Sequence, residues 1–511
     1  MVRQGRPRRV ENDGAAFVPR DKDADGCSTY LEGVGASLIE PMSEPTTAAP
    51  EAASPDEAFD AAGRARGSYA AVFERLGPGA LAGERERVRE ELAAGGVVFG
   101  GRSPRPFDVD PVPRIVEAAE WGALERGLIQ RVRALNAFLA DVYGERRIVA
   151  AGLIERELID SAEWFEPAMA DAAMPRVVAH VAGPDLVRGA DGALCVLEDN
   201  LRAPSGFAYA LAARRAMAPL AEACGLAPRP LEDGLRSLGR MLRAAAPAPV
   251  ANPLVVLLND GDAATTLYEH RRLAEALGLE VASPGELRRE GELLLLGGRR
   301  VDVIYRRVDD ERLTGPDGAP TALGELLIEP LRAGAVACVN SPGSGVADDK
   351  AVHCNVESMI GFYLEEEVLL SSVPGRWLGD PGELEPALER LAELVVKPRS
   401  EFGGSGVLIG PLASADELAL AAERIRRAPG AWVAQEPVAL SVHPTVVGEG
   451  LEGRHIDLRP FVVTDPGDGP ADDGVTVVPG GLTRFARGAG EMVVNSGQGG
   501  GAKDTWVLPA E

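Results

Sequence analysis

The longest periodic apolar pattern in the chain lies between residues 117 and 143. Its apolar side chains recur at steps of three and four, at Trp121, Leu124, Leu128, Val132, Leu135, Leu139 and Val142. This spacing places them on one face of an α-helix, and Gly144 follows where a helix commonly stops. Any fold for this chain must therefore accommodate one long helix with a continuous apolar face.

Shorter apolar stretches predict strands around this helix. Residues 176–183 and 190–200 read as an antiparallel pair around a turn at Asp191 and Gly192. An α/β unit is predicted from a strand at 252–260, a helix at 268–277 and a strand-rich segment at 292–307. A second long helix is predicted from 346 to 370. Strands at 391–398, 406–410, 432–440 and 455–463, with a helix at 415–428, complete a mixed α/β (α+β) chain.

Composition restricts the class of protein. The chain has 511 residues, of which 45% are hydrophobic, and a net charge of −25. That charge argues against a general binder of nucleic acid or anionic membranes. Five scattered cysteines without a C-x-x-C pair fit a reducing cytoplasm better than a disulfide framework. No apolar stretch is long enough to span a membrane, and residues 1–56 are predicted to be a disordered tail.

An oxygen-rich cluster follows the apolar run that ends at Leu197. Glu198 and Asn200 share one face of a strand, whereas Asp199 points to the other. Asp185, on the partner strand, can supply a third oxygen. Three such ligands suffice for Mg²⁺, which leaves its other positions to water and phosphate. The structural alternative is a turn or capping cluster, and the residues alone leave the two interpretations about even.

A second motif places a lysine before a glycine-rich loop. Lys397 ends an apolar strand, and a loop follows that contains Gly403, Gly404, Ser405 and Gly406. Backbone amides of such a loop can surround phosphate oxygens, although the order differs from a Walker loop, in which the lysine follows the glycines. For the loop alone, a simple hairpin is the better interpretation. Lys350 stands near a predicted helix start, where it either binds phosphate or is a surface charge.

Polar residues also interrupt two apolar strands. Gln435 and Glu436 lie within 432–440, where they either read an adenine edge or face water. Arg306 and Arg307 end the strand at 292–307. Buried arginines need an anionic partner, so a carboxylate or phosphate ligand is plausible, with Asp309 and Asp310 as the structural alternative.

Together these stretches resemble the circularly permuted ATP-grasp family of bacterial ligase-like proteins and, more distantly, the synthetase domain of glutathionylspermidine synthetase. The resemblance covers roughly residues 57–508. It rests on the segments FDVDPVPRIV, HVAGPDLVR, LEDNLRAPSG, RVDVIYRRVDD, NSPGSGVADDKAV, LVVKP, RHIDLRPFVV, PGGLTR and NSGQGGGAKDTWVL, together with the long helix and the GERRI that follows it. In an ordinary ATP-grasp chain the lysines precede the acidic strand, and here the order is reversed.

The resemblance implies roles for the residues found above. Lys350 and Lys397 correspond to lysines on the nucleotide phosphates. The Gly403, Gly404, Ser405 and Gly406 loop corresponds to a phosphate lid, and Gln435, Glu436 and Val438 belong to the adenine hinge. Asp185, Glu198 and Asn200 correspond to magnesium ligands, and Arg202 is a candidate for contacting the transferred phosphoryl group. The chain departs from the family pattern around the loop, in RSEFGGSGV, and in LLNDGDAATTLYEH.

The implied activity is an ATP- and Mg²⁺-dependent ligase that joins a small-molecule or peptide carboxylate to an amine through an acyl-phosphate. A phosphotransferase on the same scaffold, or a nucleotide-binding regulator with little turnover, are the alternatives. After the tail, residues 57–511 are predicted to form one module. It consists of a helical portion with the metal-ligand strands (57–240), a substrate-side α/β unit (241–345) and a nucleotide-binding lobe (346–511).

Overall fold

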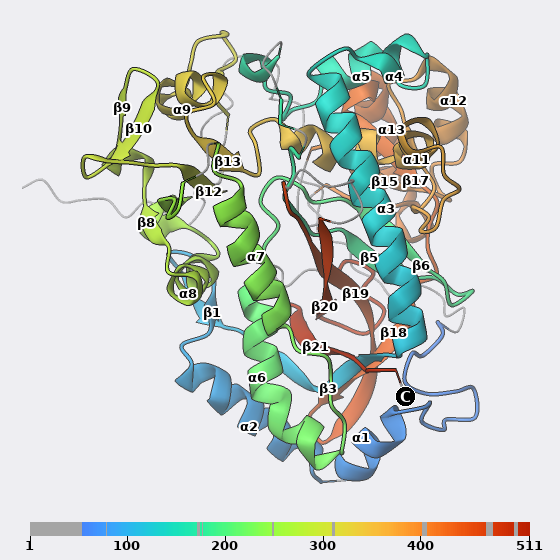
Figure 1. The fold of residues 1–511 in the computed structure, drawn as a ribbon. Helices are drawn as coiled ribbons and strands as arrows, with labels where there is room; N and C mark the ends of the chain where they lie inside the picture. Colours follow the sequence, from blue (N-terminus) through green and yellow to red (C-terminus); the bar gives the residue numbers. More distant parts are fainter. Residues whose placement is uncertain are drawn as a thin grey trace, which may run out of the picture. The chain divides into compact units, whose positions relative to one another are not determined.

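The main sheet of the protein joins strands from both ends of the described chain (Figure 1). The computed structural model describes residues 54–510 apart from 78, 171–173, 176, 248–249, 309–311, 401–405, 467–473 and 495–498. The strand order is β3-β21-β20-β19-β5-β6, and β4 and β18 also pair with β19. The strands are β3 (Val109–Val116), β4 (Val181–Ala182), β5 (Asp185–Arg188), β6 (Leu194–Glu198), β18 (Val442–Val447), β19 (Gly450–Thr464), β20 (Val475–Phe485) and β21 (Gly501–Val507).

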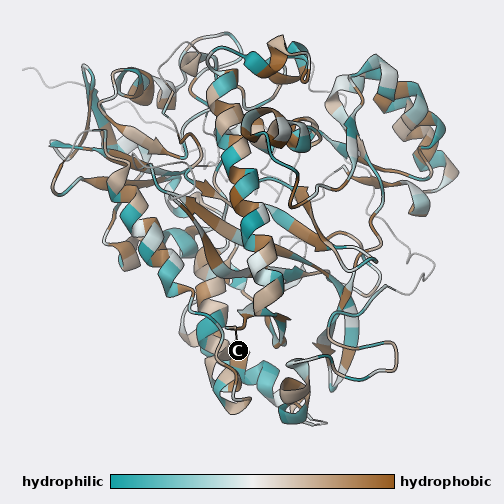
Figure 2. Ribbon diagram, turned by 45° about the vertical axis from the view of Figure 1, so that its right-hand side comes forward, coloured by the Kyte–Doolittle hydropathy of each residue, from teal (hydrophilic) through white to brown (hydrophobic). Residues whose placement is uncertain are grey.

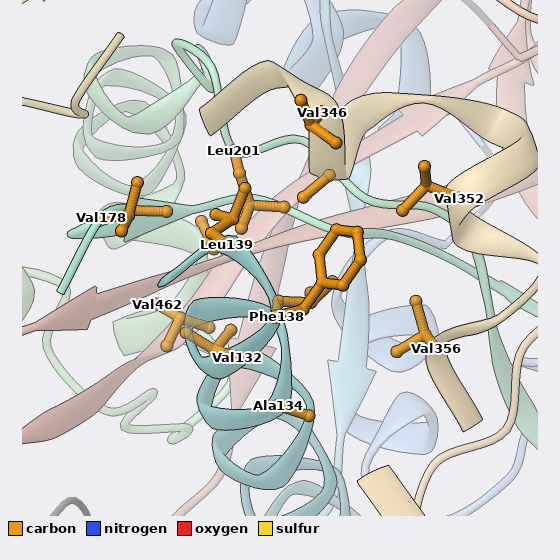
Figure 3. Packing of buried hydrophobic residues seen from close by; sticks show 14 of the residues in the cluster. Val132, Ala134, Phe138, Leu139, Val178, Leu201, Val346, Val352, Val356 and Val462 are labelled. Atoms are coloured by element: carbon orange, nitrogen blue, oxygen red, sulfur yellow. The ribbon is translucent and has the colours of Figure 1, made fainter. Parts of the chain in front are cut away.

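The predicted long helix is confirmed as α3 (Ala118–Val142). Its buried residues include the whole periodic set, and it contacts β19 and β20 of the main sheet. On another part of its surface it packs against residues 346–364, where Phe138 lies among Val346, Val352 and Val356 (Figure 3). The helix therefore ties the main sheet to the segment that carries Lys350.

Two smaller sheets flank this arrangement. The parallel sheet β13-β12-β7-β8 is formed by β7 (Val255–Asn259), β8 (Glu280–Ala282), β12 (Val303–Arg307) and β13 (Ala337–Val339). The antiparallel sheet β14-β17-β15-β16 is formed by β14 (Gly375–Trp377), β15 (Val395–Pro398), β16 (Leu408–Ile409) and β17 (Trp432–Gln435). Strands of the three sheets are largely hydrophobic, whereas hydrophilic and hydrophobic residues alternate along the helices (Figure 2).

The remaining strands are short. A hairpin sheet comprises β9 (Leu287–Glu290), β10 (Leu293–Leu296) and β11 (Arg299–Arg300), and β1 (Val98–Phe99) pairs with β2 (Arg105–Pro106). The helices besides α3 are α1 (Tyr69–Arg75), α2 (Leu81–Ala94), α4 (Arg147–Ala150), α5 (Arg156–Asp160), α6 (Phe207–Ala223), α7 (Glu232–Ala244), α8 (Leu267–Leu277), α9 (Ala322–Arg332), α10 (Lys350–His353), α11 (Val356–Leu364), α12 (Pro381–Glu389) and α13 (Ala415–Arg427). Among the described helices, none combines the length and apolar character that a bilayer crossing requires.

The predicted helix from 346 to 370 is wrong as one continuous element. The segment forms a 3₁₀ turn (Ser344–Asp348), then α10 and α11, and α11 ends at Leu364. Asp349 is extended and its carboxylate caps the amide of Ala351, which starts a new helix at Lys350. Asn355 interrupts the chain again before α11. The apolar periodicity continued across these breaks, which is why the pattern alone did not reveal them.

An antiparallel pair forms around the predicted turn, but its first strand is β5 and not the predicted segment 176–183. Residues 181–182 pair with β19, and β5 pairs with β6 around the turn at Asp191 and Gly192. Gly192 has a φ of 82°, which suits glycine at that turn. Asp185 begins β5 and stands opposite Glu198 at the end of β6, so the two carboxylates of the sequence motif are neighbours across the sheet.

Candidate active site

A pocket lies where the antiparallel sheet, α10 and the end of β6 meet. Its empty volume is about 860 Å³, part of it open to solvent. Six of the predicted site residues line it, from four segments of the chain: Glu198, Lys350, Lys397, Gln435, Glu436 and Val438. Apolar side chains such as Leu197, Val373 and Leu440 complete the wall. The pocket thus combines an apolar surface with two ammonium groups and two carboxylates.

Its charged side combines both lysines with Glu198. The Lys350 Nζ lies 4.0 Å from the Glu198 Oε2. Burial and the nearby Lys350 together lower the pKa of Lys397 to about 8, although Glu198 opposes the shift. Glu198 offsets only one of these two positive charges and a further anion would offset the other, so this side of the pocket is suited to a polyphosphate.

The pocket also contains a buried amide. Gln435, at the end of β17, is 3% exposed, and its Oε1 has no hydrogen-bond partner among the described residues. A buried acceptor without a partner is costly, and an amino group on a ligand would satisfy it. Glu436 is held by Arg390, with both contacts at 2.9 Å, and by Arg376 at 3.1 Å. It therefore lines the pocket as part of an ion-pair cluster.

The predicted metal ligands meet at the start of β5 and the end of β6. Asp185 accepts hydrogen bonds from Arg459 at 2.6 Å to each oxygen and from Arg484 at 2.8 Å. Burial alone would raise the pKa of Asp185, but these two arginines hold it well below its usual range. The Asn200 amide donates to the carbonyl of Gly183 at 3.1 Å, which leaves its oxygen uncommitted.

These oxygens fit a divalent cation in part. Glu198 stands opposite Asp185 across the strand pair, and a cation beside two adjacent carboxyl groups would offset their mutual repulsion. Asp185, however, is already neutralised by two arginines. Within the described residues, no cluster of three or more histidine, cysteine, aspartate or glutamate side chains is arranged to hold a metal ion. Magnesium binding by Asp185, Glu198 and Asn200 therefore stays a prediction.

The three predicted arginines are outside the pocket lining within the part of the chain described. The Arg202 guanidinium stacks on Trp164, with 3.5 Å to the ring centroid. Arg306 donates to the carbonyls of Asn340 and Arg202. Arg307 pairs with buried Glu269 at 2.6 Å.

The Glu269 partner of Arg307 was missed from the sequence, because it lies 38 positions away on α8. The partners named as the structural alternative, Asp309 and Asp310, lie outside the described residues. Arg459 and Arg484 were also missed, although an arginine within an apolar strand is a recognisable signal. Gly403, Gly404 and Ser405 are likewise outside the described residues. Gly406 is described, with a φ of 68°.

The pocket brings a β-sheet lysine together with a second lysine and an acidic strand end, the set expected of a protein of the ATP-grasp class. The chain matches the family model described as circularly permuted ATP-grasp type 2 over residues 113–486, and it belongs to that family. The acidic strand precedes both lysines in the chain, in keeping with the permuted order.

Curated relatives share most of the chain. An uncharacterized protein of Mycobacterium leprae is 42% identical over 89% of this chain and 82% of its own length. An uncharacterized protein of Synechocystis is 41% identical over 89% of this chain and 96% of its own. A Frankia alni protein, provisionally named glutamate–cysteine ligase 2-3, is 44% identical over 88% of this chain. The present chain spans only 53% of that Frankia protein.

Proposed function

We propose that this protein is an ATP-dependent carboxylate–amine ligase that acts on small-molecule or peptide substrates. One observation carries the proposal: Lys350, Lys397, Glu198 and the unpartnered Gln435 oxygen come from separate segments and converge on one pocket. This set matches the parts of ATP, with ammonium groups for the phosphates and an amide acceptor for the adenine amino group. Family membership supports the same reading.

The residues of the chain would act mainly by placement and charge. Lys350 and Lys397 would neutralise the phosphate oxygens as the γ-phosphoryl group moves. Gln435 would accept a hydrogen bond from the adenine amino group, and the apolar wall would enclose the ring. Arg202, held flat against Trp164, would contact the transferred phosphoryl group or the acyl-phosphate. Arg307 is neutralised by Glu269, so its role would be to hold the strand end in place.

In the proposed reaction a carboxylate oxygen of the first substrate attacks the γ-phosphorus, and the bond to the β-phosphate oxygen breaks. ADP leaves and an acyl-phosphate remains. The amine nitrogen then attacks the acyl carbon, phosphate leaves, and the nitrogen loses a proton to give an amide. If Mg²⁺ binds, Glu198 and Asn200 would hold it beside Asp185, and it would supply charge neutralisation at the phosphates.

The provisional ligase names of two Frankia relatives are compatible with amide formation. This chain covers 53% of each, so the names do not assign their activity to the shared part. The identity of the acid and the amine is therefore left open. Residence in the cytoplasm is proposed with the ligase, and the four described cysteines, all free, are consistent with it.

The test is to incubate the purified protein with ATP, Mg²⁺ and pools of acids and amines while ADP is measured and amide products are sought by mass spectrometry. Amine-dependent ADP release with a new amide supports the ligase. ADP release with an amine-independent phosphorylated product would replace it by a phosphotransferase. ATP binding without ADP release would indicate a regulator. A Glu198→Gln variant with undiminished turnover would contradict the role given to that carboxylate.

A further inference from the structure

Asp199 lies between two predicted magnesium ligands, Glu198 and Asn200, but it points away from them into the core. Its side chain is 1% exposed. Arg131 of α3 donates to both of its oxygens, Nε to Oδ1 at 2.8 Å and Nη2 to Oδ2 at 2.7 Å. His353 Nδ1 lies 2.8 Å from the same Oδ2. Asp199 is thus the centre of a buried ionic cluster.

This cluster connects the acidic strand end to the helix of the first lysine. His353 is the last residue of α10, and Lys350 is the first. Arg131 anchors the pair from α3, whose neighbouring residues pack on the same segment, as Phe138 does against Val352 (Figure 3). One carboxylate therefore joins the strand that ends at Glu198 to the helix that presents Lys350.

A second buried ion pair connects the first lysine to the other one. Asp349 caps α10 immediately before Lys350, and its Oδ1 accepts from Arg399 Nε at 2.6 Å. Arg399 follows Lys397 by two residues, at the end of β15, and its side chain is 5% exposed. The Lys350 amide also donates to the Arg399 carbonyl at 3.4 Å. This pair thus joins α10 to the strand that presents Lys397.

Lys350, Lys397 and Glu198 accordingly each have a buried ionic anchor within three positions in the chain. Buried charges hold their geometry well when they are paired and hydrogen-bonded on several sides. We propose that Asp199 and Asp349 are positioning residues, which fix the Lys350 and Lys397 ammonium groups and the Glu198 carboxylate at the separations that a nucleoside triphosphate requires. This inference rests on the proposed function, because it assumes that the pocket receives ATP.

The experiment compares binding of two probes by calorimetry in buffer with Mg²⁺. A nonhydrolysable ATP analogue would contact the lysines, Gln435 and the apolar wall, whereas adenosine would contact only Gln435 and the wall. The ratio of their affinities therefore measures the phosphate side of the pocket, and it requires no turnover. For Asp199→Asn we expect this ratio to fall about ten-fold, with adenosine affinity changed by less than about two-fold, the scale seen for residues that orient ligand-binding groups.

A matched control removes an equally buried pair elsewhere. Asp504 is 1% exposed and is bound through both oxygens by Arg214, and none of these contacts lines the pocket. Asp504→Asn should lower thermal stability but leave the affinity ratio unchanged. A pair of variants at His353 keeps the Asp199 carboxylate intact. His353→Asn retains a donor near the Nδ1 position and should preserve most of the ratio, whereas His353→Leu should lose it.

The outcomes separate the two claims. A lower ratio in Asp199→Asn and His353→Leu, with the ratio kept in Asp504→Asn and His353→Asn, supports the positioning role. An unchanged ratio in folded Asp199→Asn overturns that role and leaves the proposed function standing. If Asp199→Asn does not fold, equal ratios in His353→Leu and His353→Asn overturn it. A wild-type protein that binds the analogue no better than adenosine would overturn both claims.

Discussion

At the scale of single residues, Lys397 has a lowered pKa that lies within a pH range where binding can be measured. Its pKa falls from 10.5 to about 8 because the side chain is buried and Lys350 is close, although Glu198 partly opposes the effect. A polyphosphate in the pocket would favour the charged form. Binding and protonation at Lys397 should therefore be linked.

This linkage predicts a pH dependence of nucleotide binding. Above pH 8, Lys397 loses its proton in the nucleotide-free protein. The affinity for a nonhydrolysable ATP analogue should therefore fall with rising pH, by up to about ten-fold per pH unit. Calorimetry between pH 7 and 9.5 measures the slope. Lys397→Arg is the control, because arginine stays charged over this range and should flatten the profile. The same slope in both proteins would rule out Lys397 as the titrating group.

Glu57 offers a second prediction, on stability. It is buried against Arg114 and Arg188, which lower its pKa to about 2 despite the opposing effect of burial. A lowered carboxylate pKa stabilises the fold above the unfolded value of 4.5, and that stability is lost as pH falls toward 2. The full shift corresponds to about 3 kcal/mol.

Urea unfolding of wild type and Glu57→Gln measures this contribution. The wild type should be more stable at pH 7, and the difference between the two proteins should narrow by about 2 kcal/mol at pH 3. Arg64→Gln, which breaks the exposed pair with Asp60, serves as a control with little effect at either pH. A difference that does not depend on pH would show that Glu57 acts only by its shape.

At the scale of elements, α3 contains two glycines in opposite situations. A Cβ at Gly127 would lie 2.6 Å from the Leu370 Cβ, so the helix approaches the 365–372 segment too closely for a side chain. A Cβ at Gly122 would meet only the flexible end of Arg126, at 3.8 Å. Gly127 thus permits close packing of the helix, and Gly122 does not serve that purpose.

Alanine at these two sites should have opposite effects on the free energy of unfolding. Gly122→Ala should stabilise by about 0.5–1 kcal/mol, the usual gain in a helix interior. Gly127→Ala should destabilise by about 1–3 kcal/mol, because the overlap must be relieved by moving packed elements. Denaturant unfolding of both variants measures the contrast. A stabilising Gly127→Ala would show that the 365–372 segment can move away without loss.

At the scale of the whole described chain, the antiparallel sheet forms a lobe with its own core. Its cluster comprises only residues between Leu378 and Ala434, whereas the two larger clusters combine residues from distant parts of the sequence. The lobe supplies Lys397 and Gln435 to the pocket, and the main sheet and α10 supply Glu198 and Lys350. A ligand that binds all four should therefore link two regions whose hydrophobic cores are largely distinct.

Hydrogen exchange should show this link. The ATP analogue is expected to slow exchange in β15, β17 and α10, because a ligand that binds only the native arrangement suppresses local opening. The parallel strands β7 and β12, which do not line the pocket, should be unchanged. Lys397→Met should abolish the protection. Equal slowing of exchange in all described strands would contradict protection that is confined to the elements lining the pocket.

The sequence alone determined most of the local elements and the residue types of the pocket. The α3 pattern, the strands ending at Glu198 and Lys397, and the amide at Gln435 are visible because side-chain periodicity and polar interruptions are local properties. Six predicted residues line one pocket. The family resemblance predicted that they would converge, whereas their spacing along the chain could not predict it.

Only the tertiary structure decided which charges neutralise one another. Asp185, which the sequence predicts to be a cation ligand, is bound by Arg459, 274 positions away. Asp199 is bound by Arg131 and His353. The break at Asp349 also has a distant partner, because the Asp349 carboxylate is held by Arg399. Pairing energy depends on distance in space, and no periodic pattern along the chain reports it.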